Sequence, residues 1–468
     1  RQGLVITQIS VGQTPATIYR RAEITKAPAV IIAHGFAGSQ QLMQAYALTL
    51  AQAGYIAVTF DFDGHGRNPT PMSGDVTRPD GTTRILMREI GRITDVALDL
   101  PEVDGRVALL GHSMASDIIV RRAEEDPRVA ATIAISMFSD AVTPTAPRNL
   151  LVISGAWETY LRQDALKNVR LAEPGANEGE TIGDPAKDNG RRAAVAPHVE
   201  HVTVLYSQAA LREARDWLDR VFHRTSDAPV ASTGGWIVLL LAGIVLLAWP
   251  LSSLLPRQKP PPADISLPTF LTATVLPALL TPLLLSVVDT HFLPVLVADY
   301  LTAHLFVYGI LLIGLLAWRG VRVGHVDWLS AALVTLYCVG VFGGALDRYV
   351  ASFVPVGGRV LIIAAVAVGA LSYMLSDSLV TEGSRASFVR TIFARFAFLS
   401  SLGIAVALDF KRLFFLLIII PVIVLFFIIF GLIGGWVGRR TQSPATVGIA
   451  LGVTLAWAIG VTFPMFAP

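Results

Sequence analysis

Apolar runs recur along the whole chain, but their length and spacing change near residue 228. Before that point, short runs rich in β-branched residues, such as PAVIIAHG and YIAVTFDFDG, are separated by helical patterns such as QQLMQAYALTLAQAG and TRILMREIGRITDVALDL. Strands that are apolar throughout and separated by helices are typical of a parallel sheet covered on both faces. The pattern predicts an α/β fold with a mostly parallel sheet.

The same alternation continues to the end of the first part. GRVALLGHS, RVAATIAISM and RNLLVISGAWE predict further strands, a helix is expected from Ser116, and SQAALREARDWLDRVF predicts a last amphipathic helix. The alternating residues 1–21 predict an antiparallel hairpin at the sheet edge. Residues 171–190, rich in Gly, Asn and acids, predict a long surface loop. Only about 11 residues separate Met137 from Asn149, so no large lid domain is expected there.

After residue 228 the apolar runs are about 20 residues long, which matches a hydrocarbon core of ~30 Å. The runs lie near 236–255, 267–288, 295–318, 328–346, 358–376, 388–408, 413–435 and 446–466. The sixth contains Arg390 and Arg395, and could instead lie in the membrane interface. We therefore predict two domains, an α/β domain over 1–228 and an all-α polytopic transmembrane bundle of seven or eight helices over 229–468.

Composition agrees with this division. Of the 468 residues, 53% are hydrophobic and 15% charged, against roughly 25% charged in soluble domains. Residues 229–468 hold 13 Lys or Arg and 8 Asp or Glu, whereas residues 1–228 hold 24 and 27. The net charge of +2 is scattered, which excludes nucleic acid as an expected partner. The single cysteine, Cys338, excludes a disulfide within the chain.

The loops between the apolar runs predict an orientation. If all eight runs span and the first domain lies outside, seven basic residues fall in inner loops and four in outer loops. This bias favours an extracytoplasmic α/β domain. The expected location is a bacterial inner membrane, in which the protein would be multi-pass, with the bilayer as a partner. A homo-oligomer would form through the membrane domain.

Gly111-His112-Ser113-Met114-Ala115 stands where a predicted strand passes into a predicted helix. This is the context of a nucleophile elbow, in which small residues two before and two after the serine permit a sharp turn. Ser113 is therefore the candidate nucleophile. The alternative is a serine that caps the following helix.

A serine hydroxyl needs a base, and the base needs an orienting acid. Both follow in the expected order of serine, acid, histidine. Glu158 ends the run RNLLVISGAWE, and His201 precedes the last helix. Asp164 and His198 are the competing residues. No metal or cofactor is required by this chemistry.

The oxyanion hole of such a site uses two backbone N–H groups. One belongs to the residue after the nucleophile, Met114. The other is expected in the loop His34-Gly35-Phe36-Ala37-Gly38, where Phe36 is the candidate donor. The alternative for this loop is an ordinary glycine turn.

With these motifs, residues 1 to about 225 resemble the α/β-hydrolase-fold serine hydrolases. The likeness rests on HGFAGS at 34–39, GYIAVTFDFDGHGRN at 54–68, GHSMA at 111–115, LLVISGAWE at 150–158 and EHVTVLYS at 200–207. It implies that Asp63 and His65 form a turn and do not catalyse. The sequence departs from the superfamily pattern at Ala115, where glycine is usual, and at Glu158, where aspartate is commoner.

Four polar residues around the second pair of apolar runs are Asp289, His291, Asp299 and His304. Asp299 and His304 are five residues apart, about 140° around a helix, so they do not share a face as metal ligands four apart would. Polar groups at helix ends are the expected interpretation.

The sequence therefore predicts a membrane-anchored serine hydrolase that cleaves carboxylic esters, including lipid or other amphiphilic acyl esters, through an acyl-enzyme. One alternative is an acyltransferase that uses the same triad. Another is a non-catalytic sensor or transporter that uses the α/β domain as a binding module. An intact Ser113, His201 and acid in the expected order favour the enzyme.

Overall fold

The computed structural model describes residues 3–75, 79–258, 265–295 and 297–467, and the chain folds into two compact units. The first, the sheet unit, comprises Arg1–Val238, Asp347–Val356 and Pro464–Pro468; the second, the helical unit, comprises Leu239–Leu346 and Gly357–Phe463. The last two ranges of the sheet unit, far along the chain from the first, are called the returning segments.

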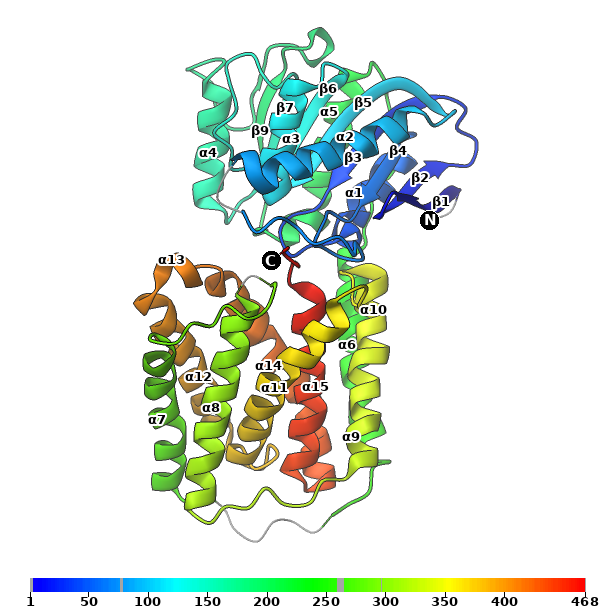
Figure 1. Ribbon diagram of the computed structural model, residues 1–468. Coiled ribbons are helices and arrows are strands. Elements are labelled where there is room, and N and C mark those ends of the chain that lie inside the picture. Colours follow the sequence, from blue (N-terminus) through cyan, green and yellow to red (C-terminus); the bar gives the residue numbers. More distant parts are fainter. Residues whose placement is uncertain (1–2, 76–78, 259–264, 296, 468) are drawn as a thin grey trace. The chain divides into compact units, whose positions relative to one another are not determined.

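The described strands form one nine-stranded sheet in the order β1-β2-β4-β3-β5-β6-β7-β9-β8 (Figure 1). The strands are β1 Leu4–Val11, β2 Thr14–Arg21, β3 Ala27–Ala33, β4 Ile56–Phe60, β5 Val103–His112, β6 Val129–Ile135, β7 Leu150–Gly155, β8 Thr181–Ile182 and β9 Arg191–Ala196. Neighbours from β4 to β9 run parallel, whereas β1–β2, β2–β4 and β8–β9 are antiparallel. The sequence prediction of a mostly parallel sheet with an antiparallel edge hairpin is confirmed.

Helices cover both faces of this sheet (Figure 1). They are α1 Gln44–Gln52, α2 Arg84–Leu98, α3 Met114–Glu125, α4 Thr159–Arg170 and α5 Gln208–Val221. Val30 and Ile32 of β3 pack with Tyr46 of α1 and Trp217 of α5, whereas Val152 of β7 packs on the other face with α3 and α4. Burial on both faces explains why the strands are apolar throughout.

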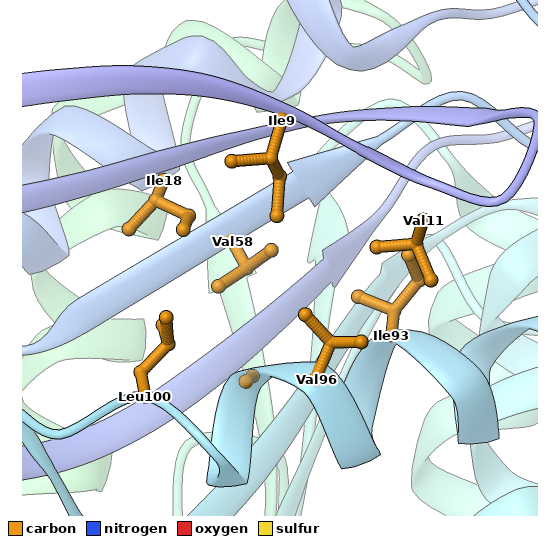
Figure 2. Close-up of a pocket in the computed structure, with 8 residues that line it drawn as sticks. Ile9, Val11, Ile18, Val58, Ile93, Val96 and Leu100 are labelled. Atoms are coloured by element: carbon orange, nitrogen blue, oxygen red, sulfur yellow. The ribbon is translucent and has the colours of Figure 1, made fainter.

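Short helical turns complete the unit. They are η1 Gln40–Met43, η2 Pro79–Thr83, η3 Pro185–Lys187 and η4 Thr203–Tyr206. Figure 2 shows apolar packing near the sheet edge, where Ile9 and Val11 of β1 and Ile18 of β2 meet Ile93 and Val96 of α2. All the lining side chains here are apolar, so this part of the sheet unit is core rather than a polar binding site.

Three elements differ from the sequence expectations. Helix α4, which follows Glu158, was not expected, because only Ala165, Asn168 and Val169 of its twelve residues are buried. Strand β9 begins with two arginines and therefore lacks an apolar run. The expected surface loop at 171–190 contains β8 and η3.

The helical unit contains most of the apolar runs. Its helices are α6 Gly234–Ser252, α7 Leu267–Leu285, α8 Ala298–Trp318, α9 Trp328–Thr335, η5 Leu336–Phe342, α10 Gly343–Tyr349, α11 Arg359–Val380, α12 Phe388–Leu408, α13 Phe410–Leu413, α14 Leu416–Thr441 and α15 Pro444–Thr462. Among the described residues, eight helical stretches are long and apolar enough to cross a membrane, with α9, η5 and α10 counted as one. They correspond to the eight predicted runs, including the arginine-containing sixth.

Small residues let helices of this unit approach closely. A side chain at Gly309 of α8 would meet the Ser372 backbone of α11 at 2.5 Å, and one at Gly369 of α11 would meet the Thr302 carbonyl of α8 at 2.3 Å. Close backbone approach through small residues is typical of helix packing in membranes.

The first returning segment is held in the sheet unit by polar contacts. Asp347 forms an ion pair with Arg67, and its backbone carbonyl accepts a hydrogen bond from the Gln41 side chain at 3.2 Å. The Ser352 N–H donates to the Ser39 hydroxyl at 2.9 Å. These contacts join residues more than 270 positions apart in the chain.

The second returning segment pairs with the loop after β4. The Met465 N–H donates to the Gly64 carbonyl at 2.9 Å, the Met72 N–H donates to the Met465 carbonyl at 2.8 Å, and the Ala467 N–H donates to the Met72 carbonyl at 2.6 Å. Gly64 has φ +75°, and a side chain there would lie 2.5 Å from the Met465 carbonyl oxygen. Glycine is therefore required where this segment docks.

Candidate active site

Ser113 lies on a strained turn between β5 and α3. Its φ of 54° and ψ of −118° are costly for a residue with a side chain, and strain of this kind is typical of a nucleophile elbow. A side chain at Gly111 would meet the Ala115 carbonyl oxygen at 2.8 Å, and Ala115 itself is fully buried. The turn therefore needs glycine before the serine and accepts alanine after it.

The Ser113 side chain does not cap α3. It makes no capping hydrogen bond, and its Oγ lies 2.9 Å from His201 Nε2. His201 Nδ1 lies 2.6 Å from Glu158 Oε1. With the proton on Nδ1, His201 donates to Glu158 and accepts from Ser113, which is the arrangement a general base needs.

Hydrogen bonds to the second carboxylate oxygen of Glu158 favour its ionised form. Oε2 accepts hydrogen bonds from the Ser136 hydroxyl at 2.7 Å and from the Gly155 N–H at 2.6 Å, and the side chain is only 6% exposed. Burial alone would raise the pKa of this carboxyl, but the hydrogen bonds from His201, Gly155 and Ser136 lower it below its ordinary value. Ser136, at the end of β6, was not expected from the sequence.

The competing residues lie elsewhere. His198 is exposed in a turn, and Asp164 accepts a hydrogen bond from Asn168 within α4. The structure brings together Ser113, His201 and Glu158, and it leaves His198 and Asp164 outside the hydrogen-bonded chain.

The two candidate oxyanion donors come from segments beside Ser113. Met114 is the first residue of α3, where backbone N–H groups have no acceptor within the helix. Phe36 follows Gly35, whose position is so close to Ser113 that a side chain there would meet the Ser113 Cβ at 3.0 Å. The next residue, Ala37, has φ 54°, so this loop is also strained.

The loop carrying Phe36 is anchored from both ends. His34 Nδ1 lies 2.8 Å from the Gly35 carbonyl and can donate to it, while His34 Nε2 accepts from the Phe62 N–H at 3.1 Å. The Asp61 carboxylate accepts from the Gln40 N–H at 2.7 Å. Burial lowers the pKa of His34, which keeps its ring neutral in this role.

The first returning segment contacts the same anchor. Asp61 also accepts from the Arg67 N–H at 3.0 Å, and the Arg67 side chain pairs with Asp347. Ser39, which binds Ser352, follows the oxyanion loop directly. No local pattern could have indicated these contacts, because the partners are hundreds of residues apart.

Asp63 and His65 lie in the turn after β4. Asp63 accepts a hydrogen bond from Asn68 at 3.0 Å, and the His65 N–H donates to the Phe62 carbonyl at 2.9 Å. Neither belongs to the Ser113 hydrogen-bonded chain, as the resemblance implied.

The polar residues near the second pair of apolar runs are separated. His291 lies 2.6 Å from Asp289 in an exposed contact, whereas His304 is buried and lies 3.0 Å from the Ser401 hydroxyl. In the described part of the chain, no three His, Cys, Asp or Glu side chains are grouped so that they could hold a metal ion.

His112, next to Ser113 in the chain, contacts the backbone of His201. Its Nε2 lies 2.8 Å from the His201 backbone carbonyl, and because a carbonyl only accepts, Nε2 must carry the proton. Burial lowers the pKa of His112 to about 4, so the ring is neutral at physiological pH. His112 therefore fixes the backbone that carries His201, a role the sequence did not reveal.

We expect His112 to make stability dependent on pH. Its pKa is about 4 when folded, against an ordinary 6.5, so its contribution is complete above pH 6.5 and is lost as the pH falls toward 4. The loss corresponds to about 3 kcal/mol, at about 1.4 kcal/mol per pKa unit. Thermal unfolding of the full chain from pH 7 to 4.5 should show a smaller decline in Tm for His112→Gln than for the unmodified protein. Parallel declines would contradict this assignment.

Part of the sheet unit matches a known protein family. Residues 25–195 match the family model described as Hydrolase_4: Serine aminopeptidase, S33. A comparison with curated proteins finds no match.

Three solved structures are similar to about half of this chain. A hypothetical protein from Pseudomonas aeruginosa is 13% identical with a TM-score of 0.37, covering 47% of this chain and 95% of that one. A predicted CIB-like hydrolase from Thermoplasma acidophilum is 14% identical with a TM-score of 0.35, covering 46% and 97%. A methylesterase is 16% identical with a TM-score of 0.37, covering 50% and 58%. The family match and the sheet order together identify the N-terminal part of the chain as an α/β-hydrolase domain.

Proposed function

We propose that this protein is a serine hydrolase that cleaves carboxylic esters through an acyl-enzyme. The observation that carries the proposal is the continuous hydrogen-bonded chain from Ser113 through His201 to Glu158, with the serine on a strained turn. Residues brought together from positions 113, 158 and 201 at these distances have little structural purpose apart from activating a hydroxyl.

The geometry supports a two-step reaction. His201 Nε2 takes the proton from Ser113 Oγ as the oxygen attacks the ester carbonyl carbon, and the N–H groups of Phe36 and Met114 stabilise the resulting oxyanion. The C–O bond to the alcohol then breaks, and His201 returns its proton to the leaving alkoxide. Water, deprotonated by His201, attacks the acyl-serine, and the products are a carboxylic acid and free Ser113.

Labelling with a fluorophosphonate probe, followed by assay on an ester panel, tests this function. The full-length protein should form a covalent adduct on Ser113 and release acid and alcohol from simple esters. The matched family is described as a serine aminopeptidase, so an aminoacyl amide belongs in the same panel. Absence of both labelling and turnover would refute the proposal.

Acyl transfer is the second candidate, because an alcohol can replace water in the deacylation step without any change at the triad. Product analysis with and without a lipid or sugar alcohol distinguishes the two. An ester product formed at the expense of free acid would identify a transferase.

For the membrane, we propose a multi-pass protein with the hydrolase domain on the extracytoplasmic side, on the basis of eight helices of spanning length and the seven-to-four loop bias. In spheroplasts, a membrane-impermeant maleimide should label Asp227→Cys, an exposed position before α6. Arg322→Cys, exposed between α8 and α9, should react only after lysis. The native Cys338 is buried. The opposite labelling pattern would place the domain in the cytoplasm.

A further inference from the structure

Four large apolar side chains that lie within two residues of Ser136, Glu158 or His201 in the chain are exposed. They are Phe138 at 51%, Trp157 at 66%, Tyr160 at 75% and Val202 at 48% exposure, and together they are called the apolar rim. Among the described residues up to 228, only Ile6 and Leu171 are other large apolar side chains in the exposed class. Exposed apolar side chains that gather in one place mark an interaction site.

Chain position ties each rim residue to the triad. Trp157 precedes Glu158, and Tyr160 follows Glu158 by two residues. Val202 follows His201. Phe138 lies two residues beyond Ser136, whose hydroxyl binds Glu158. The Trp157 N–H donates to the Val199 carbonyl at 3.1 Å, which joins the loops that carry the acid and the base.

In the described sheet unit, no helical lid is inserted between β6 and β7. The connection from β6 to β7, residues 136–149, contains no helix or strand. The rim side chains are therefore available to a substrate that reaches Ser113.

We infer that the apolar rim binds the acyl chain of a lipid-like ester, an inference that rests on the proposed ester hydrolysis. Two observations select an amphiphile over a small soluble ester. The rim combines Trp and Tyr, the side chains that favour the boundary between lipid and water, and the same chain carries eight helices suited to a bilayer.

The inference predicts a preference for long acyl chains. Each methylene covered by the rim should strengthen binding about fourfold, so kcat/KM should be higher for octanoate than for acetate esters. In Phe138→Ser/Tyr160→Ser, the ratio of kcat/KM for the octanoate ester to that for the acetate ester should fall at least tenfold, as expected when about two methylenes lose their cover.

The control is Leu171→Ser. Leu171 is also exposed, at 41%, but lies past the far end of α4, about 16 Å along the helix axis from Tyr160. Its ratio should match that of the unmodified protein. Rates are normalised to the fraction of sites labelled by a small fluorophosphonate, and Tyr160→Ser alone, on the exposed first turn of α4, replaces the double variant if that does not fold.

The outcomes separate the two proposals. If both esters are cleaved and the rim variants keep the original ratio, the inference is wrong while the proposed function stands. An equal fall in the ratio for Leu171→Ser also overturns it. If the unmodified protein labels with the probe but cleaves neither ester, the proposed ester hydrolysis fails, and this inference fails with it.

Discussion

Replacing Ser113 with alanine is expected to abolish fluorophosphonate labelling and to lower kcat for ester hydrolysis roughly 10⁶-fold, the loss typical of removing a triad nucleophile. The hydroxyl is the only group removed, and its partner in the structure is His201 Nε2 at 2.9 Å. Alanine and serine both carry a Cβ, so the strain of φ 54° at this position is about the same for either residue. The turn should therefore keep its conformation. Tm and expression should therefore stay close to those of the unmodified protein.

Labelling is the decisive measurement for this variant. Intact-protein mass spectrometry should detect one adduct per chain in the unmodified protein and none in Ser113→Ala. Full labelling of the variant would show that another residue is the nucleophile and that the elbow assignment is wrong.

Glu158→Gln is expected to lower kcat by roughly 10³ to 10⁴. In the structure, one carboxylate oxygen accepts from His201, and the other accepts from both Ser136 and Gly155. An amide has only one accepting atom, so glutamine must turn its NH₂ either toward these two donors or toward His201. If the NH₂ points toward His201, it favours the tautomer with the proton on Nε2 instead of Nδ1. In that tautomer, His201 cannot accept the proton of Ser113.

Asp164→Asn is the matched control, since it makes the same chemical change six residues along in α4 without contact to His201. Its kcat should equal that of the unmodified protein. A large loss in Asp164→Asn with none in Glu158→Gln would reassign the acid.

The parts of the fold that the sequence predicted are those governed by local pattern. Apolar strand runs flanked by helical patterns located β3 to β7, and uniform runs of about 20 residues located all eight apolar helices, because a buried strand and a long apolar helix each leave a regular pattern in sequence. Ser113 could be proposed as a nucleophile because the sharp turn of such a residue requires small neighbours in sequence. Its partners followed from their order along the chain rather than from any contact.

What could not be predicted depends on contacts between distant residues. The hydroxyl of Ser136 and the ring of His112 are ordinary in sequence. Ser136 acquires its role only when β6 pairs with β7, which Glu158 follows, and His112 only when the loop carrying His201 reaches the end of β5. Strand β9 lacks an apolar pattern because Arg191 and Arg192 begin it. The pairing of Asp347 with Arg67 spans 280 positions and leaves no periodic signal.

The returning segments set an order of events during biosynthesis. A ribosome delivers the chain from its N-terminus, and domains generally fold in that order, so β1 to β9 and α5 can assemble while the later helices are still untranslated. The partners of Arg67 and Gly64, however, lie at Asp347 and Met465, and Met465 follows every one of the eight apolar helices. The hydrolase domain thus gains its last backbone pairing only after those helices have been made, which delays its completion until the helical unit has been synthesised.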